Sequence, residues 1–105
     1  MTVREVLCKA RKLLSDKKRW CVGSWHTTSR NGLDQYCALG ALNKIGGDTP
    51  ERNAARTTLQ ASAKELYGSQ VIVVNDHRGY EATLKMFDHA IEKACEAEGG
   101  HEHES

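Results

Sequence analysis

The segment Tyr36-Cys37-Ala38-Leu39-Gly40-Ala41-Leu42 is the stretch around which the rest of the chain is organised. It follows the turn residues Arg30-Asn31-Gly32 and ends before Gly46-Gly47. The segment is too short to be stable as an isolated helix, and its Ala and Gly residues cover little surface. These properties predict a core helix that carries Cys37 through Ile45, whose small residues let other segments approach its backbone closely.

The length and composition are those of an ordinary globular protein. The chain has 105 residues, of which 39% are hydrophobic and 28% are charged, which is enough for one modest core. No apolar run approaches the roughly 20 residues that span a bilayer, and the first residues lack a secretory pattern. Four cysteines without an export signal favour reduced thiols in a cytoplasm over a disulfide scaffold. We therefore expect a cytoplasmic protein without a membrane segment, with one globular domain over residues 1–98 and a flexible tail over residues 99–105.

The net charge of +1 conceals an asymmetry between the two ends of the chain. Seven basic and two acidic residues lie between Arg4 and Arg19, whereas seven acidic and two basic residues lie between Glu81 and Ser105. Two explanations remain open. The charged helix faces attract one another or keep the protein soluble, or the basic end is a patch for a phosphate-bearing ligand or an acidic partner. Binding to duplex DNA is not expected, because the chain lacks a strong positive balance and a recognisable motif.

Start and stop signals predict three further helices. Thr2 and Glu5 have the spacing of a capping box at the start of the first helix. Thr49 followed by Pro50 is a strong start for the second of these helices, and Gly68 is its natural terminator. The predicted helices cover about residues 3–16, 50–67 and 80–98.

Two segments have extended character. The run Val71-Ile72-Val73-Val74 is β-branched throughout and predicts a short buried strand. Residues 20–26 combine aromatic and β-branched side chains with a central Gly, and a hairpin through the turn at 29–32 would return to Tyr36. In the alternative, Asp34 caps the following helix and there is no second strand. The predicted fold is a compact, mostly α single domain of about four helices with a short β-hairpin or irregular extended segments.

Cys37 is the candidate nucleophile of the chain. A position near a helix N-terminus lowers a thiol pKa, and His26 or His77 as base with Asn75 or Asp76 as orienting group would complete the residue types of a Cys-His hydrolase. The apolar neighbours of Cys37 would raise its pKa instead if the thiol is buried. We therefore expect a packed structural thiol and no catalytic residues.

A metal site would have to combine Cys21, His26, Cys37 and His77. Zinc accepts such mixed sulfur and nitrogen ligands. The spacing of these residues matches no common zinc module, so neither a metal nor a cofactor is expected.

The polar residues after the predicted strand are the strongest candidates for binding. Asn75 and Asp76 would lie at the end of a strand and before a helix, where ligand crevices and anion sites often occur. In the alternative, Asp76 caps the last helix and Asn75 satisfies the backbone of the loop. Trp20, Trp25 and Tyr80 pose the same choice between a core aromatic and a stacking surface. The residues predicted to bind a ligand are Trp20, Trp25, Asn75, Asp76, Arg78, Gly79 and Tyr80.

Three motifs in order, Trp20-Cys21-x-Gly23, Cys37-Ala38-Leu39-Gly40-Ala41-Leu42 and Asn75-Asp76-x-x-Gly79, carry a family resemblance. The chain resembles a family of small uncharacterised proteins of actinobacteria and bacteriophages over residues 3 to 95. Val74 departs from the pattern, since such proteins often have Trp there. The resemblance implies an architecture and a phage or bacterial setting, but no mechanism. It also suggests a role against host defences.

These observations predict a non-enzymatic small binding protein of a phage or bacterial cytoplasm. As a counter-defence factor it would inhibit a host protein or sequester a signalling nucleotide, so that its partner is a host protein or a small phosphate-bearing ligand. Association into a homo-oligomer is compatible with the opposite charges of the two ends. The alternative, from a different functional class, is a small Cys-His hydrolase with Cys37 as nucleophile.

Overall fold

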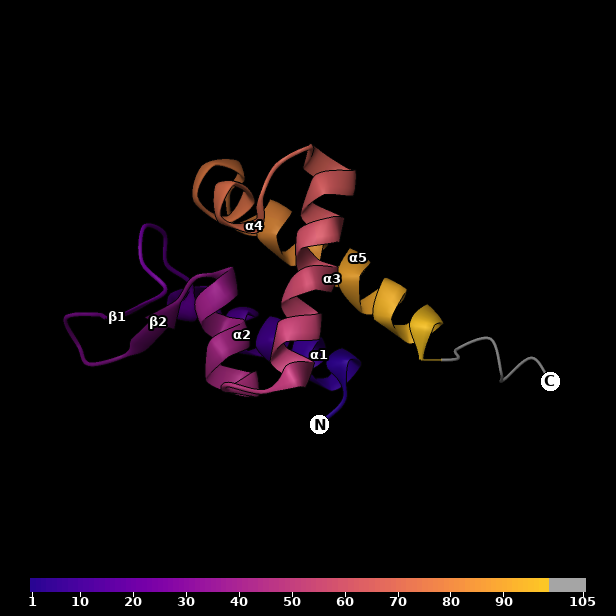
Figure 1. Cartoon of the computed structure of the whole chain (residues 1–105). Coiled ribbons are helices and arrows are strands. Elements are labelled where there is room, and N and C mark those ends of the chain that lie inside the picture. Colours follow the sequence, from indigo (N-terminus) through magenta and orange to yellow (C-terminus); the bar gives the residue numbers. More distant parts are fainter. Residues whose placement is uncertain (99–105) are drawn as a thin grey trace.

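The computed structural model describes residues 1–98. Helices meet around a shared apolar core, while a short hairpin projects from one side and the C-terminal half of the last helix from the other (Figure 1). The predicted mostly α fold with a short hairpin is confirmed. In chain order the elements are α1 (Val3–Leu14), the 3-10 turn η1 (Lys17–Arg19), β1 (His26–Thr28), β2 (Asp34–Tyr36), α2 (Ala38–Gly46), α3 (Pro50–Tyr67), α4 (Val71–Val73), the π-helical turn η2 (Val74–Arg78) and α5 (Tyr80–Ala97).

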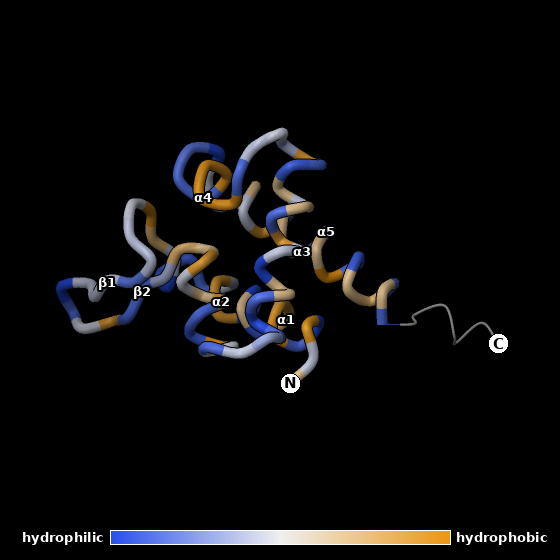
Figure 2. The backbone as a smooth tube through the Cα atoms, in the orientation of Figure 1, coloured by the Kyte–Doolittle hydropathy of each residue, from blue (hydrophilic) through white to orange (hydrophobic). Residues whose placement is uncertain are grey.

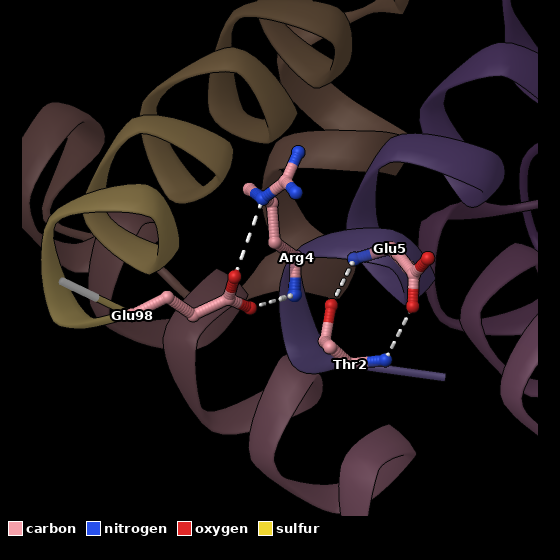
Figure 3. A network of polar contacts seen from close by, with 4 residues as sticks. All are labelled: Thr2, Arg4, Glu5 and Glu98. Carbon is pink, nitrogen blue, oxygen red and sulfur yellow. Dashed lines mark hydrogen bonds and ion pairs between the residues drawn. The ribbon is translucent and has the colours of Figure 1, made fainter. Parts of the chain in front are cut away.

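Helix α1 begins at the predicted capping box. The hydroxyl oxygen of Thr2 accepts a hydrogen bond from the Glu5 backbone N–H at 3.1 Å, and the Glu5 carboxylate accepts one from the Thr2 N–H at 2.7 Å (Figure 3). The helix ends at Leu14, slightly earlier than predicted, where the N–H and hydroxyl of Ser15 both bond the carbonyl of Lys12. Its fully buried residues are Val6, Leu7, Ala10 and Leu14.

The basic first helix and the acidic last helix attract each other, as one of the two explanations of the charge asymmetry predicts. Arg11 donates two hydrogen bonds to the Asp88 carboxylate, at 2.9 and 3.3 Å. Glu98 accepts from the backbone N–H and from the Nε of Arg4, at 3.2 and 3.3 Å (Figure 3). The bond from the Arg4 backbone is the largest cause that lowers the pKa of Glu98. Exposed pairs of this kind add little stability singly, so the packing of α5 on α1 does not depend on either pair alone.

The hairpin is confirmed, and it settles where α2 begins. Strands β1 and β2 pair antiparallel, with His26 opposite Tyr36. Asp34 lies in β2 and bonds the His26 ring at 3.0 Å, so the alternative in which it caps the helix is wrong. The N-cap of α2 is Cys37, whose sulfur accepts from the Gly40 N–H at 3.4 Å.

Helix α3 follows its local signals at both ends. The Thr49 hydroxyl accepts from the Arg52 N–H at 3.1 Å, and Pro50 occupies the first turn as predicted. Gly68 ends the helix with φ of 64°, a left-handed conformation that glycine adopts without a steric penalty. The helix packs against α1, α2 and α5.

The segment Val71–Val74 is helical, and the strand predicted there is wrong. A strand needs a neighbour for its backbone groups, and in the described part of the chain the one sheet is the hairpin β1–β2. As a helix the segment buries Val71 and Val74 completely, one turn apart, and Gln60 accepts from the Val71 N–H at 3.1 Å. Figure 2 shows that hydrophobic α4 passes directly into the hydrophilic turn η2. Short β-branched runs fit either structure, so the tertiary surroundings decide.

None of the helices within residues 1–98 is both long and apolar enough to cross a membrane. The predicted flexible tail, residues 99–105, lies outside the described residues.

Candidate functional site

Asn75 is fully buried in η2 and uses the whole hydrogen-bonding capacity of its side chain. Its Oδ1 accepts from the Trp20 indole Nε1 at 2.8 Å and from the Ala38 N–H at 3.0 Å. Its Nδ2 donates to the Cys21 carbonyl at 3.0 Å and to the Asp76 carboxylate at 2.9 Å. Asn75 therefore has no polar group left for a ligand. It joins η2 to the N-terminus of α2 and to the segment that precedes the hairpin.

That segment, residues 20–25, is called the tryptophan loop below. Its backbone is anchored by hydrogen bonds from Cys21 N to Tyr36 O (3.1 Å), from Gly23 N to Asp76 Oδ1 (3.2 Å) and from Cys37 N to Trp25 O (3.2 Å). Two apolar side chains of the loop nevertheless face solvent, since Val22 is 50% exposed and Trp25 is 41% exposed. The tryptophan loop therefore has a backbone fixed by hydrogen bonds and two apolar side chains exposed to solvent.

Asp76 does not cap the last helix, so that alternative of the sequence analysis is wrong. The residue before α5 is Gly79, and no side chain caps the helix there. Gly79 has φ of 96°, which favours glycine and excludes a comfortable fit for other residues. The Asp76 carboxylate instead accepts hydrogen bonds from the Gly23 N–H and from the Asn75 side-chain amide. The carboxylate stabilises the tryptophan loop.

The remaining predicted aromatic residues divide between packing and exposure. The rings of Trp20 and Tyr80 lie 5.4 Å apart at 59°, and the Tyr80 hydroxyl donates to the Leu14 carbonyl at 2.6 Å. Arg78 lies 5.4 Å from the centre of the Tyr67 ring. The structure thus joins Trp20, Asn75, Asp76 and Tyr80 into one supporting cluster, whereas Trp25 and Arg78 contact other parts of the fold.

Trp25 has neighbours that the sequence analysis missed. The Arg56 guanidinium of α3 lies 5.6 Å from the centre of the Trp25 ring. A shallow pocket of about 280 Å³ beside Trp25 is lined by His26, Tyr36, Gly40, Asn43 and Lys44. Single polar residues on helices form no motif, so the sequence carried no signal for Arg56 or Lys44.

A second cavity, called the α3–α5 groove below, was also missed. It has a volume of about 570 Å³ and is lined mainly by small residues of α3 and α5. At its wall the His89 ring bridges the two helices through Ser62 Oγ (2.8 Å) and Glu65 Oε2 (2.9 Å). The Ser62 hydroxyl lies in the middle of α3, where backbone N–H groups are bonded within the helix and cannot form an oxyanion hole. The bridge therefore fastens α5 to α3.

Cys37 is fully buried, and its burial is the largest cause that raises its pKa. The Gly40 N–H acts in the opposite direction because it donates to the sulfur. A hydrolase with this nucleophile would need the thiolate, which burial disfavours. The position supports the expected packing role of Cys37 at the start of α2.

The four cysteines are expected to react with iodoacetamide in an order set by their burial. Cys95 is exposed, Cys8 and Cys21 are half-buried, and Cys37 is buried. Burial also raises the pKa of Cys21. We expect Cys95 to be alkylated first and Cys37 at least about 100-fold more slowly, because its labelling requires local opening. Peptide mass spectrometry over time at neutral pH measures the rates.

Two further samples make the alkylation test decisive. In strong denaturant all four thiols should react at similar rates, and in Cys95→Ser the fast phase should disappear. Fast labelling of Cys37 in the folded protein would contradict a purely structural thiol and revive the hydrolase alternative.

The described residues offer no ready-made site for a metal ion. Within residues 1–98, no group of three or more His, Cys, Asp or Glu side chains is placed to hold a metal ion.

The model of a protein family described as a family of unknown function (DUF6197) matches residues 1–93. No curated protein and no solved structure matches the chain.

Proposed function

The chain belongs to this family of unknown function, and we propose that it is a non-enzymatic binding protein that presents the tryptophan loop to a protein partner. The observation that carries this proposal is the exposure of Val22 and Trp25, at 50% and 41%, on a backbone held by hydrogen bonds to the side chains of Asn75 and Asp76. Tryptophan and arginine dominate the residues that contribute most to protein interfaces. Here Arg56 lies over the Trp25 ring.

The anchoring of the loop favours binding. Ordering a flexible loop costs free energy on association, whereas a loop that is already ordered loses little. The bonds of Asn75 and Asp76 to Cys21 and Gly23 supply that order before a partner arrives. The four clustered residues among the predicted ligand contacts thus act through the loop, and Trp25 is the predicted residue that would touch the partner.

The charges near Trp25 indicate the chemistry of the partner. The Arg56 guanidinium lies over the Trp25 ring, and Lys44 lines the adjacent pocket. An apolar hollow flanked by carboxylates would match Val22, Trp25 and these two cations. Inhibition of a host protein in a phage or bacterial cytoplasm is the biological role that we propose for this surface. Sequestration of a signalling nucleotide is the competing role.

The test is the complex that the protein forms when it is recovered gently from cells of its host. Native mass spectrometry is expected to detect a complex with one macromolecule for the wild type. The double variant Val22→Ser, Trp25→Ala should weaken that complex at least about 30-fold, since loss of a central Trp typically costs 2 kcal/mol or more. Binding is then measured with the purified partner.

Leu66→Ser is the matched control, because Leu66 is also 41% exposed but lies on α3. It should leave the affinity unchanged. If the double variant Val22→Ser, Trp25→Ala bound the partner as tightly as the wild type, the proposal would be overturned. An apo monomer that a nucleotide panel stabilises against heat would favour nucleotide sequestration instead.

A further inference from the structure

The α3–α5 groove is the largest cavity described above, and its floor is apolar. Five lining residues with small or aliphatic side chains form this floor. They come from α3, from the last turns of α5 and from the start of α1. The residues are Val3, Ala54, Ala61, Ala94 and Ala97.

The hydroxyl groups around the groove are already satisfied by the protein. Thr57 and Thr58 donate to carbonyls of their own helix, those of Asn53 at 3.2 Å and Ala54 at 3.0 Å. Ser62 is bonded to the His89 ring. These hydroxyl groups therefore have few hydrogen bonds to offer a polar ligand, and the groove behaves as an apolar surface.

Among residues 1–98, the charged groups on the rim differ in whether they have a partner. Glu65 accepts a hydrogen bond from the His89 ring, and Glu98 is paired with Arg4. Lys93 also lines the groove, and no ion pair or side-chain hydrogen bond engages it within the described part of the chain. A lone ammonium beside an apolar floor is complementary to a molecule that has an apolar body and one anionic head.

We propose that the α3–α5 groove binds a small amphipathic anion, with its head at Lys93 and its apolar chain along the alanine floor. The cavity of about 570 Å³ lies within the usual range for small-molecule sites, roughly 300 to 1,000 Å³. This site shares no residue with the tryptophan loop, so it does not depend on the proposed partner.

Decanoate is the probe for this site, with decanol as its uncharged counterpart. Titration up to about 5 mM is followed by amide chemical shifts, because ligands of this size reach only modest affinity. We expect 1:1 binding of decanoate with shifts in α3 and the C-terminal half of α5. Decanol should bind about threefold more weakly, because it lacks the charge that the Lys93 ammonium attracts.

Two substitutions in α5 separate a specific head-group contact from general attraction. Lys93→Glu should weaken decanoate about tenfold, since the favourable contact becomes a repulsion. Lys85→Glu is the matched control variant, because Lys85 is exposed on the same helix but does not line the groove. It should leave the affinity within about twofold. Ala61→Phe, which fills the groove at an exposed position, should abolish binding while the thermal midpoint stays near that of the wild type.

Several outcomes would overturn the proposal. They are the absence of shifts with decanoate, equal affinity for decanol, equal weakening by the two lysine variants, and undiminished binding to Ala61→Phe. A concentration-dependent dimer whose dissociation shifts the same groove amides would show that a second copy of the chain occupies the groove instead.

Discussion

Replacement of Asn75 by Ala is expected to lower the free energy of unfolding by about 4 kcal/mol, because it leaves three buried or partly buried polar groups without partners. The groups are the Trp20 indole N–H, the Ala38 N–H and the Cys21 carbonyl, all bonded by one amide in the native protein. Each unsatisfied group costs about 1 to 3 kcal/mol. Domains of this size are stable by about 5 to 15 kcal/mol, so the substitution should remove a large fraction of the total stability.

Urea denaturation followed by circular dichroism measures this loss. Asn53→Ala is the matched control, because Asn53 is exposed on α3 and its side chain makes none of the hydrogen bonds described within residues 1–98. Its effect should stay within about 0.5 kcal/mol. If Asn75→Ala were to change stability by no more than the control, Asn75 would not be the residue that joins η2 to α2 and the tryptophan loop.

A second variant at the same position tests the hydrogen-bonding explanation without removing volume. In Asn75→Asp, an oxygen replaces the Nδ2 group that faces the Cys21 carbonyl and the Asp76 carboxylate. The buried new carboxyl would have a pKa raised above that in the unfolded chain. The folded variant therefore holds this proton to higher pH than the unfolded chain does. The stability of the variant relative to the wild type should be greatest below the unfolded pKa and should fall as pH rises through the folded pKa.

Gly40→Ala is expected to destabilise the protein by about 3 kcal/mol, the opposite of the usual effect of this change within a helix. A Cβ at position 40 would lie 1.7 Å from the carbonyl oxygen of Trp25 and 2.6 Å from its carbon. Both contacts are with backbone, so the tryptophan loop would have to move. That movement breaks the hydrogen bond from Cys37 N to Trp25 O.

The sign of the change is the measurement that decides this prediction. Gly to Ala in a helix normally stabilises by about 1 kcal/mol, and that gain should be absent here. Lys44→Ala, at an exposed position of the same helix, is the control and should leave the thermal midpoint nearly unchanged. Faster amide exchange across residues 20–25 should accompany the loss in Gly40→Ala. A stabilised variant with a protected loop would refute the close approach of Trp25 to α2.

The sequence predicted most helix ends because those ends depend on neighbours in the chain. Thr2 with Glu5, Thr49 with Pro50, and Gly68 act within one turn of the residues that they cap. Cys37 did not follow this rule. Its sulfur caps α2, a role that sequence reasoning gave to Asp34 as one alternative, because Cys is not among the usual capping residues.

The candidate site was predicted in part. The sequence singled out the Asn75-Asp76 pair and Trp20 and left open whether they face a ligand or support the fold; the structure places them in the support of the tryptophan loop. The exposure of Trp25 and Val22, the cation of Arg56 and the α3–α5 groove came from the tertiary structure. Exposure depends on what the rest of the chain covers, and no periodicity within one segment records it.

By itself the sequence determined the helical class, the capped ends of α1 and α3, the turn residues of the hairpin and the opposite charges of the two ends. Only the tertiary structure decided that Val71–Val74 is a helix and that Asn75 is a buried joint. The physical reason is distance along the chain. Asn75 bonds Ala38 and Trp20, which are 37 and 55 residues away. The Trp25 carbonyl, 15 residues before Gly40 in the chain, occupies the space that a Cβ of residue 40 would fill.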